Sequence, residues 1–213
     1  MRVAVAGGHG QVAMHLHPLL VKRGDSVRAL IRNPDHGSEV EAAGAEPVIC
    51  DLEADDDVSE AVGEVDAVVF AAGAGPGSGA ARKRTMDLGG AVKLIDAAKE
   101  NGISRYVIVS SMGAGSPPAS GGDTFGEYLR SKAEADRAVA ESGLDYTIVR
   151  PGGLTNDEPT GMVSAAPSLP RGRVPRADVA AVLVGCLHLD HTIGHTFELR
   201  SGETPIDEAL AAL

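Results

Sequence analysis

The stretch AVAGGHGQVA, residues 4–13, decides the fold of this chain. The apolar run Val3–Ala6 enters it, and a helix-compatible segment leaves it. Gly7, Gly10 and Ala13 fit the spacing G-x-x-G-x-x-A, with Gly8 as an additional glycine. In such a turn the first glycine makes the bend, the second lets a pyrophosphate approach the backbone, and the small third residue lets helix pack on strand. The stretch therefore predicts a strand, a phosphate-binding loop and a helix.

The start of that helix supplies free N–H groups and the positive end of the helix dipole to a phosphate. A tight turn without any ligand is the alternative, but the position after the first strand and before a helix favours the ligand. We interpret His9 as a loop residue near the phosphates and not as a base. The cofactor contacts expected from this segment are Gly7, Gly8, His9, Gly10, Gln11 and Val12.

Short apolar runs alternate with helix-compatible segments along the whole chain. The expected strands are 3–6, 27–31, 47–50, 67–71, 106–109, 146–149 and 196–199. The expected helices lie near 11–23, 37–43, 56–62, 85–101, 125–142 and 177–189. This alternation predicts an α/β fold: a doubly wound, mainly parallel sheet with helices on both faces, in one domain of residues 1–213.

Three segments fit neither a strand nor a helix. Residues 76–79 and 113–122 are rich in Gly, Ser and Pro, and we expect both to be loops. Residues 153–176 are rich in Pro, Gly and polar side chains, although a further strand and helices follow them. We therefore expect 153–176 to form a small lid on the substrate side of the domain and not a linker.

Composition limits the classes of partner. The 213 residues are 43% hydrophobic and 3% aromatic, with no Trp, which suits one domain with a full core. The formal net charge of -11 argues against nucleic acid or an anionic membrane as a partner. Apolar runs are too short for a membrane span, and Cys50 and Cys186 form no CxxC pattern. We expect a soluble cytoplasmic protein, monomeric or a small homo-oligomer, with a small-molecule substrate.

The ends of the predicted strands indicate which nucleotide is bound. The second strand ends at Arg32, whose charge suits a 2′-phosphate and favours NADP over NAD. Asp25, the acid nearest the expected spacing, precedes that strand and so lies at the wrong edge of the sheet. Asp51 and Leu52, after the third strand, are placed to touch the adenine. Ala71, Ala72 and Gly73, after the fourth, let the backbone pass close to the ribose and nicotinamide.

The segment EYLRSKAEADRA, residues 127–138, holds a tyrosine and a lysine four residues apart. Wound at about 100° per residue, it places Tyr128 on an apolar side with Lys132 in the middle of that side. A lysine there is snorkelling, paired or functional, and Asp136 is a possible structural partner one turn on. Thr124 and Glu127 fit a capping box at the helix start.

The combination of the glycine loop with FAAGAG, VIVSSMG, the Tyr128–Lys132 pair and DYTIVRPGGL resembles the short-chain dehydrogenase/reductase superfamily with its Rossmann-type fold. More narrowly, it resembles the atypical NAD(P)-binding branch related to NmrA-like regulators and to flavin and biliverdin reductases. Members of that branch are often labelled epimerases or dehydratases. The likeness runs over nearly the whole chain and is more specific for fold than for function.

The resemblance implies catalytic roles for Ser111, Tyr128 and Lys132. The tyrosine exchanges a proton with the substrate oxygen, the lysine holds the nicotinamide ribose and favours the ionised tyrosine, and the serine orients the substrate. Either Ser110 or Ser111 is the serine that faces the substrate. Cofactor contacts are also implied at Ser110, Lys132, Pro151, Gly152 and Gly153.

Three functions remain open at this point. The first is an NADP-dependent oxidoreductase acting on a small carbonyl or alcohol, or on a flavin- or quinone-like compound. The second is a non-catalytic sensor of NADP(H), and the third is a sugar-nucleotide epimerase or dehydratase. We expect no metal, because the seven histidines do not converge with acids or cysteines. The basic run Arg82–Arg84 is either a solvated face or a contact for an anionic substrate.

Overall fold

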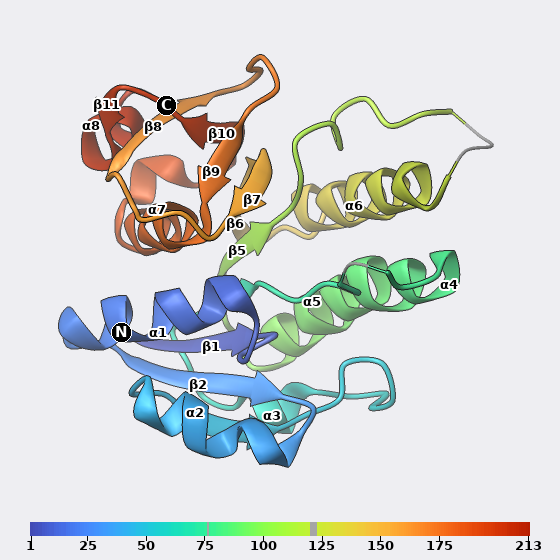
Figure 1. The fold of residues 1–213 in the computed structure, drawn as a ribbon. Coiled ribbons are helices and arrows are strands. Elements are labelled where there is room, and N and C mark those ends of the chain that lie inside the picture. The colour runs from blue at the N-terminus through green and yellow to red at the C-terminus, as the bar shows by residue number, and fades with distance from the viewer. Residues whose placement is uncertain (76, 120–122) are drawn as a thin grey trace.

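A computed structural model describes residues 1–75, 77–119 and 123–213 of the chain. Pro76 and residues 120–122, which belong to the loops expected at 76–79 and 113–122, lie outside the described residues. One nine-stranded sheet dominates the fold, in the order β11-β8-β10-β6-β5-β4-β1-β2-β3, and β7 and β9 form a separate pair (Figure 1). No helix within the described ranges is both long and apolar enough to span a bilayer.

The sheet is parallel from β3 through β10, and β8 and β11 are antiparallel additions at one edge. The strands are β1 Arg2–Ala6, β2 Ser26–Ile31, β3 Glu46–Ile49, β4 Ala67–Phe70, β5 Arg105–Val109, β6 Asp145–Pro151, β7 Gly153–Thr155, β8 Met162–Ala166, β9 Arg173–Pro175, β10 His195–Ser201 and β11 Thr204–Pro205. The α-helices are α1 Gln11–Lys22, α2 Gly37–Ala42, α3 Ser59–Val62, α4 Ala80–Arg82, α5 Ala91–Glu100, α6 Thr124–Ala140, α7 Arg176–His188 and α8 Ile206–Ala211. The 3₁₀ turns η1 Pro34–His36 and η3 Asp190–Thr192 and the π-helical segment η2 Lys83–Gly90 complete the set.

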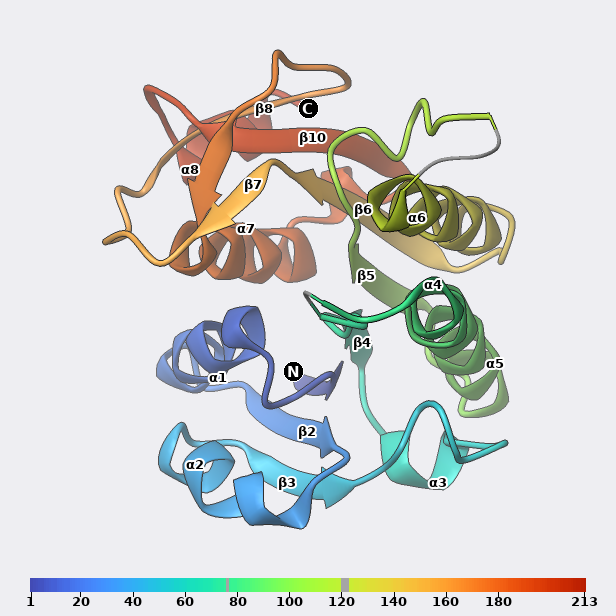
Figure 2. The ribbon, with the colours of Figure 1, turned by 45° about the vertical axis from the view of Figure 1, so that its right-hand side comes forward.

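Alternate residues along each strand build two hydrophobic cores, one on each face of the sheet. Val3 and Val5 of β1 join the core beneath α1, α2, α7 and α8, whereas Ala4 and Ala6 join the core beneath α3, α5 and α6. Figure 2 shows α1 and α7 on one side of the strands and α5 and α6 on the other. Such two-sided burial confirms the predicted doubly wound α/β fold.

The strand order reverses at β1. Strands β2 and β3 lie on one side of β1, and the chain then crosses over the sheet so that β4 pairs with the other side of β1. In open parallel sheets a crevice forms at the carboxyl ends of the strands where the order reverses, and ligands bind there. The glycine loop, residues 7–10, follows β1 at this reversal, so the fold itself places the candidate site.

Several elements differ from the sequence-based expectation. The helix expected at 85–101 begins at Ala80 and continues through the π-helical segment η2 into α5, and the helix expected at 56–62 is only α3. The segment expected to be a lid, 153–176, contains β7, β8 and β9. Strand β8 pairs with β10 across a separation of some thirty residues. Local apolar periodicity carries no signal for such a pairing.

Candidate functional site

A cavity of about 700 Å³ opens at the carboxyl ends of β1, β2, β4 and β5. The predicted site residues that line it are Gly7, Gly8, His9, Gly10, Gln11, Val12, Arg32, Asp51, Leu52, Ala71, Ala72, Gly73, Ser110, Tyr128 and Lys132. Four predicted residues, Ser111, Pro151, Gly152 and Gly153, are not among the residues that line it. One cavity therefore brings the predicted phosphate loop together with the predicted tyrosine and lysine.

The glycine loop packs backbone against backbone. Gly7 has a φ of +79°, and a Cβ atom on it would lie 2.6 Å from Cα of Ala72. A Cβ on Gly8 would lie 2.7 Å from Cβ of Ala29. Gly10 is the N-cap of α1, which has no side-chain cap and no acidic residue in its first turn. Among the described residues, no side chain caps this helix start, so the loop fits a dinucleotide.

A buried histidine of α1, His17, hydrogen-bonds to this loop. Nε2 of His17 lies 2.6 Å from the carbonyl oxygen of Gly8, and because a carbonyl only accepts, Nε2 carries the proton. Burial lowers the pKa of His17, against the smaller opposing effect of that hydrogen bond. The ring is therefore neutral, and its Nδ1 makes no hydrogen bond within the described residues.

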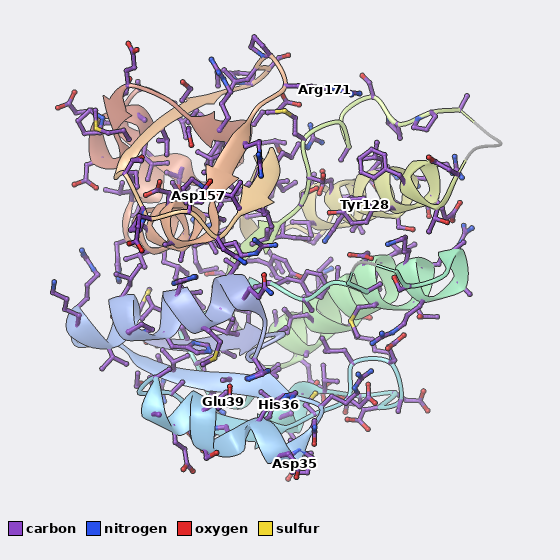
Figure 3. All side chains as sticks on the ribbon, in the orientation of Figure 1. Asp35, His36, Glu39, Tyr128, Asp157 and Arg171 are labelled. Atoms are coloured by element: carbon purple, nitrogen blue, oxygen red, sulfur yellow. The ribbon has the colours of Figure 1, made fainter. Side chains whose placement is uncertain are left out.

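The far end of the cavity carries Arg32 and a pair of histidines. Nη1 of Arg32 lies 3.4 Å from Glu53, and the arginine side chain is half exposed. The rings of His9 and His36 stack with centroids 3.7 Å apart, and Nε2 of His9 lies 2.9 Å from Glu39. The bond from His9 lowers the pKa of Glu39. Figure 3 labels His36 and Glu39 near α2, on the opposite side of β1 from Tyr128 on α6.

Lys132 is buried and paired. The residue is 3% exposed; its Nζ donates to the carbonyl of Val109 at 3.1 Å and lies 3.2 Å from Oδ1 of Asp87. Asp136, the partner considered from helical spacing, instead accepts from Nε of Arg150 at 2.8 Å. The i,i+4 pairing of Lys132 with Asp136 is therefore wrong, because Asp136 is taken by an arginine of β6. Burial raises the pKa of Asp136, opposed by Ser110 and Arg150.

Tyr128 lies among other rings and cations. Its ring centroid is 5.9 Å from Nζ of Lys132, 5.1 Å from Nζ of Lys83 and 5.9 Å from the ring of Phe125. The helix that carries it does not begin with the expected capping box of Thr124 and Glu127. Asp123 is the N-cap, and its carboxylate accepts a hydrogen bond from the N–H of Gly126 at 3.0 Å. Thr124, one residue later, is already the first residue of the helix and does not act as the cap.

The two serines at the end of β5 have different surroundings. Ser110 lines the cavity and is buried, and its hydroxyl faces Asp136 without a hydrogen bond of regular geometry within the described residues. The hydroxyl of Ser111 donates to the carbonyl of Met112 at 3.3 Å. Ser110 thus lines the cavity as a residue, but its hydroxyl oxygen is buried and not exposed to the cavity.

Sequence reasoning identified the cavity wall only in part, although it gave Arg82 and Lys83 as a possible contact for an anionic substrate and placed Leu154 and Arg176 in the expected lid. The additional lining residues are Leu30, Ile31, Asn33, His36, Cys50, Ala74, Gly75, Arg82, Lys83, Met86, Asp87, Val109, Phe125, Leu154 and Arg176. Of these, Asp87 had a local signal: an acid between Met86 and Leu88 in a predicted amphipathic helix. Gly73 makes room for it, since a Cβ there would lie 3.2 Å from its carboxylate. In residues 1–75, 77–119 and 123–213, no three His, Cys, Asp or Glu side chains are grouped as metal ligands.

The buried His17 predicts a pH-dependent stability. Its folded pKa is below the ordinary value of 6.5, so the unfolded chain takes up the proton first. The contribution of neutral His17 to the unfolding free energy is complete at pH values above 6.5 and is lost as the pH falls through the lowered pKa. The unfolding free energy then decreases by no more than about 1.4 kcal/mol per pH unit. His17→Gln keeps a donor to Gly8 but cannot titrate. The unfolding free energy, measured with urea between pH 7.5 and 5.5, should therefore change with pH with a smaller slope in the variant than in the wild type, because about one titrating proton is removed. The exposed His15→Gln should keep the wild-type slope, and an unchanged slope in His17→Gln contradicts the assignment.

The pair Lys132–Asp87 predicts strong energetic coupling. Lys132→Met or Asp87→Leu alone leaves one buried charge without its partner and should cost about 3–5 kcal/mol of unfolding free energy. The double variant should cost much less than the sum of the two. Arg84 and Glu134, an exposed pair at 3.7 Å, provide the control cycle, with a coupling of about 0–1 kcal/mol. Chemical denaturation of all variants measures both cycles, and equal couplings would show that the buried pair carries no special energy.

Comparison with known proteins agrees with this geometry. The profile of the family described as NAD(P)H-binding matches residues 7–190. The Bacillus subtilis protein named uncharacterized sugar epimerase YhfK is 39% identical over 215 residues, which cover 100% of both chains. A solved structure from Bacillus halodurans, provisionally named an NAD-dependent epimerase/dehydratase, is 42% identical with a TM-score of 0.94 over 100% of both chains.

A reductase is also among the relatives. The 4-hydroxy-2-methyl-3-oxo-4-farnesyl-3,4-dihydroquinoline-1-oxide ketoreductase of Stigmatella aurantiaca is 31% identical over 166 residues, covering 71% of this chain and 49% of the relative. Family profile, relatives and fold point to the same dinucleotide-binding architecture. The chain belongs to the NAD(P)H-binding family and has its Rossmann-type fold.

Proposed function

We propose that the protein is an NADP-dependent oxidoreductase of the short-chain type that acts on a small carbonyl or alcohol, or on a flavin- or quinone-like compound. The observation that carries the proposal is that one cavity holds the glycine loop, Tyr128 and Lys132. Membership of the NAD(P)H-binding family supports the cofactor class, and the ketoreductase relative supports reduction of a carbonyl.

When bound, the nicotinamide supplies or accepts the hydride. The Tyr128 hydroxyl donates a proton to the carbonyl oxygen as its carbon is reduced, and takes the proton back in the reverse direction. One of the two serines at the end of β5, Ser110 or Ser111, orients the same oxygen, as the family resemblance implies. Lys132 holds the ribose as a hydrogen-bond donor, and because Asp87 neutralises much of its charge, we assign it to positioning more than to electrostatic activation.

Arg32 is the residue we propose for NADP preference. The residues at the end of β2 that line the cavity, Ile31, Arg32 and Asn33, include no acid that would bind a ribose 2′-hydroxyl. The pairing of Arg32 with Glu53 at 3.4 Å is long and exposed on the arginine side. A 2′-phosphate can therefore replace or share that partner.

We further propose that residues 153–176 act as a substrate-side lid. Leu154 of β7 and Arg176, the first residue of α7, both line the cavity. Asp178 accepts from the N–H groups of Thr160 at 3.0 Å and Gly161 at 2.9 Å, which ties the middle of the segment to α7. We also propose a cytoplasmic location, consistent with two buried free thiols, Cys50 and Cys186.

Tyr128→Phe tests the chemistry. With a panel of carbonyls, quinones and flavins, the change should lower NADPH oxidation at least about 10²-fold, because the proton donor is lost. The NADPH dissociation constant should stay within about threefold, since the ring and its packing remain. Absorbance assays and calorimetry measure the two quantities, and Tyr146→Phe, outside the cavity, is the matched control. Undiminished turnover in Tyr128→Phe would remove this residue from the mechanism.

Arg32→Ala tests the cofactor preference. NADPH should bind about tenfold or more weakly, since a charge-assisted hydrogen bond contributes ~1.5–3 kcal/mol. NADH, which has no 2′-phosphate, should bind with nearly unchanged affinity. Arg84→Ala, an exposed arginine outside the cavity, should change neither affinity. Equal weakening of both cofactors by Arg32→Ala would contradict a role in 2′-phosphate recognition.

The name of the Bacillus subtilis relative favours a second function, sugar epimerisation. An epimerase returns the hydride to its substrate, so product would form without net consumption of cofactor. A non-catalytic sensor would bind NADPH tightly and turn over none of the compounds tested. Following product and cofactor absorbance in the same reactions distinguishes the three functions.

A further inference from the structure

Most cations that line the cavity already have carboxylate partners. Arg32 lies 3.4 Å and Arg82 3.0 Å from the same acid, Glu53. Lys132 lies 3.2 Å from Asp87. Each of these three cations thus has a carboxylate partner, although Arg32 and Arg82 share one between them. An incoming anion would have to compete with a carboxylate at each of them.

Lys83 and Arg176 are different. Nζ of Lys83 donates to the hydroxyl of Ser78 at 3.3 Å, and Nη1 of Arg176 donates to the amide oxygen of Asn156 at 2.8 Å. Within the part of the chain that the structure describes, neither cation has a carboxylate oxygen within the 4.0 Å of a salt bridge. Both cations line the cavity, so an anion from outside the protein can reach them.

Lys83 is the more informative of the two, because the residue is only 9% exposed and yet lines the cavity. Its hydrogen bond to the Ser78 hydroxyl is part-buried, and a neutral hydroxyl does not neutralise the ammonium charge. Its Nζ lies 5.1 Å from the centroid of Tyr128, and η2, which carries it, packs against α6. Figures 1 and 2 show the adjoining helix α4 running beside the start of α6. The uncompensated charge therefore faces the place where the substrate would meet the proposed proton donor.

An exposed ring lies next to this charge. Phe125 is 56% exposed, lines the cavity, and has its ring centroid 5.9 Å from that of Tyr128. The chain has only three Phe and three Tyr and no Trp. Two of these six rings, Phe125 and Tyr128, line the cavity, whereas Phe70 and Tyr106 are fully buried in the core. A flat ring stacks well against such a surface.

We propose that Lys83 binds a carboxylate of the substrate, and that the substrate is a planar aromatic or quinonoid ring that packs on Phe125. The location beside Tyr128 rests on the proposed oxidoreductase function, but the binding itself needs no turnover. The bound carboxylate supplies the counter-ion that Lys83 lacks, and the ring covers the exposed face of Phe125. Arg176 lies on the lid side of the cavity and remains available to a second polar group.

The test compares 2-naphthoate with 2-naphthamide, which share the ring and differ in charge. Isothermal titration of the NADPH-saturated protein should show 2-naphthoate binding at least about tenfold more tightly. Lys83→Met should abolish that difference and leave the amide affinity unchanged, whereas Lys83→Arg should retain part of it. Arg84→Met, at the neighbouring exposed arginine, should behave as wild type. Phe125→Ala should weaken both compounds by a similar factor.

Two outcomes overturn the proposal. One is equal binding of naphthoate and naphthamide to the wild-type protein, a comparison that stands even if Lys83→Met does not fold. The other is a Lys83→Met variant that keeps the preference for naphthoate, or that loses NADPH affinity instead, which would assign Lys83 to a cofactor phosphate. The oxidoreductase proposal fails separately, through absent hydride transfer or an active Tyr128→Phe variant.

Discussion

The contact between Gly7 and Ala72, at the neighbouring ends of β1 and β4, is the constraint on which the site depends. A Cβ on Gly7 would lie 2.6 Å from Cα of Ala72, and the φ of +79° is one that side chains rarely allow. This close approach places the turn from β1 into α1 against the end of β4, at the point where the strand order reverses. The N-terminus of α1, the end of β4 and the end of β5 then surround one cavity. His17 adds a hydrogen bond to Gly8 from the buried face of α1, so the same loop is fixed from both sides.

The buried charges show how the end of the cavity that holds Tyr128 and Lys132 is organised. Lys132 pairs with Asp87, which enters from the π-helical segment η2, and Gly73 leaves room for that carboxylate. A π-helical turn displaces the residues within it from regular α-helical positions, and such turns are frequent at functional sites. In this protein the turn also carries Lys83, the cation beside Tyr128. One helix thus supplies both the counter-ion of the proposed ribose clamp and the charge that we assign to the substrate.

The parallel strands and the glycine loop were predictable from sequence because each has a local cause. A strand buried on both faces reads as a continuous apolar run, as in Ala67–Phe70, and the loop needs glycines at fixed spacing. Strand β8 was not predictable, because its pairing with β10 is a long-range event at the sheet edge. The partner of Lys132 was not predictable from sequence for a related reason. Spacing along one helix suggests Asp136 as a possible partner. The packing of η2 against α6, which brings Asp87 to Lys132, is a contact between two helices that spacing along one helix does not reveal.

The net charge of the whole chain repels anions, whereas the charges that line the cavity attract them. A chain with a formal net charge of -11 repels anions at a distance, so nonspecific anion binding is weak. Inside the cavity, however, Arg32, Arg82, Lys83, Lys132 and Arg176 outnumber the acids Asp51 and Asp87. Desolvation strengthens interactions at short range while solvent screens the outer surface. An anion is therefore attracted mainly once it enters the cavity, where Lys83 and Arg176 are the lining cations that have no carboxylate within salt-bridge distance among the described residues.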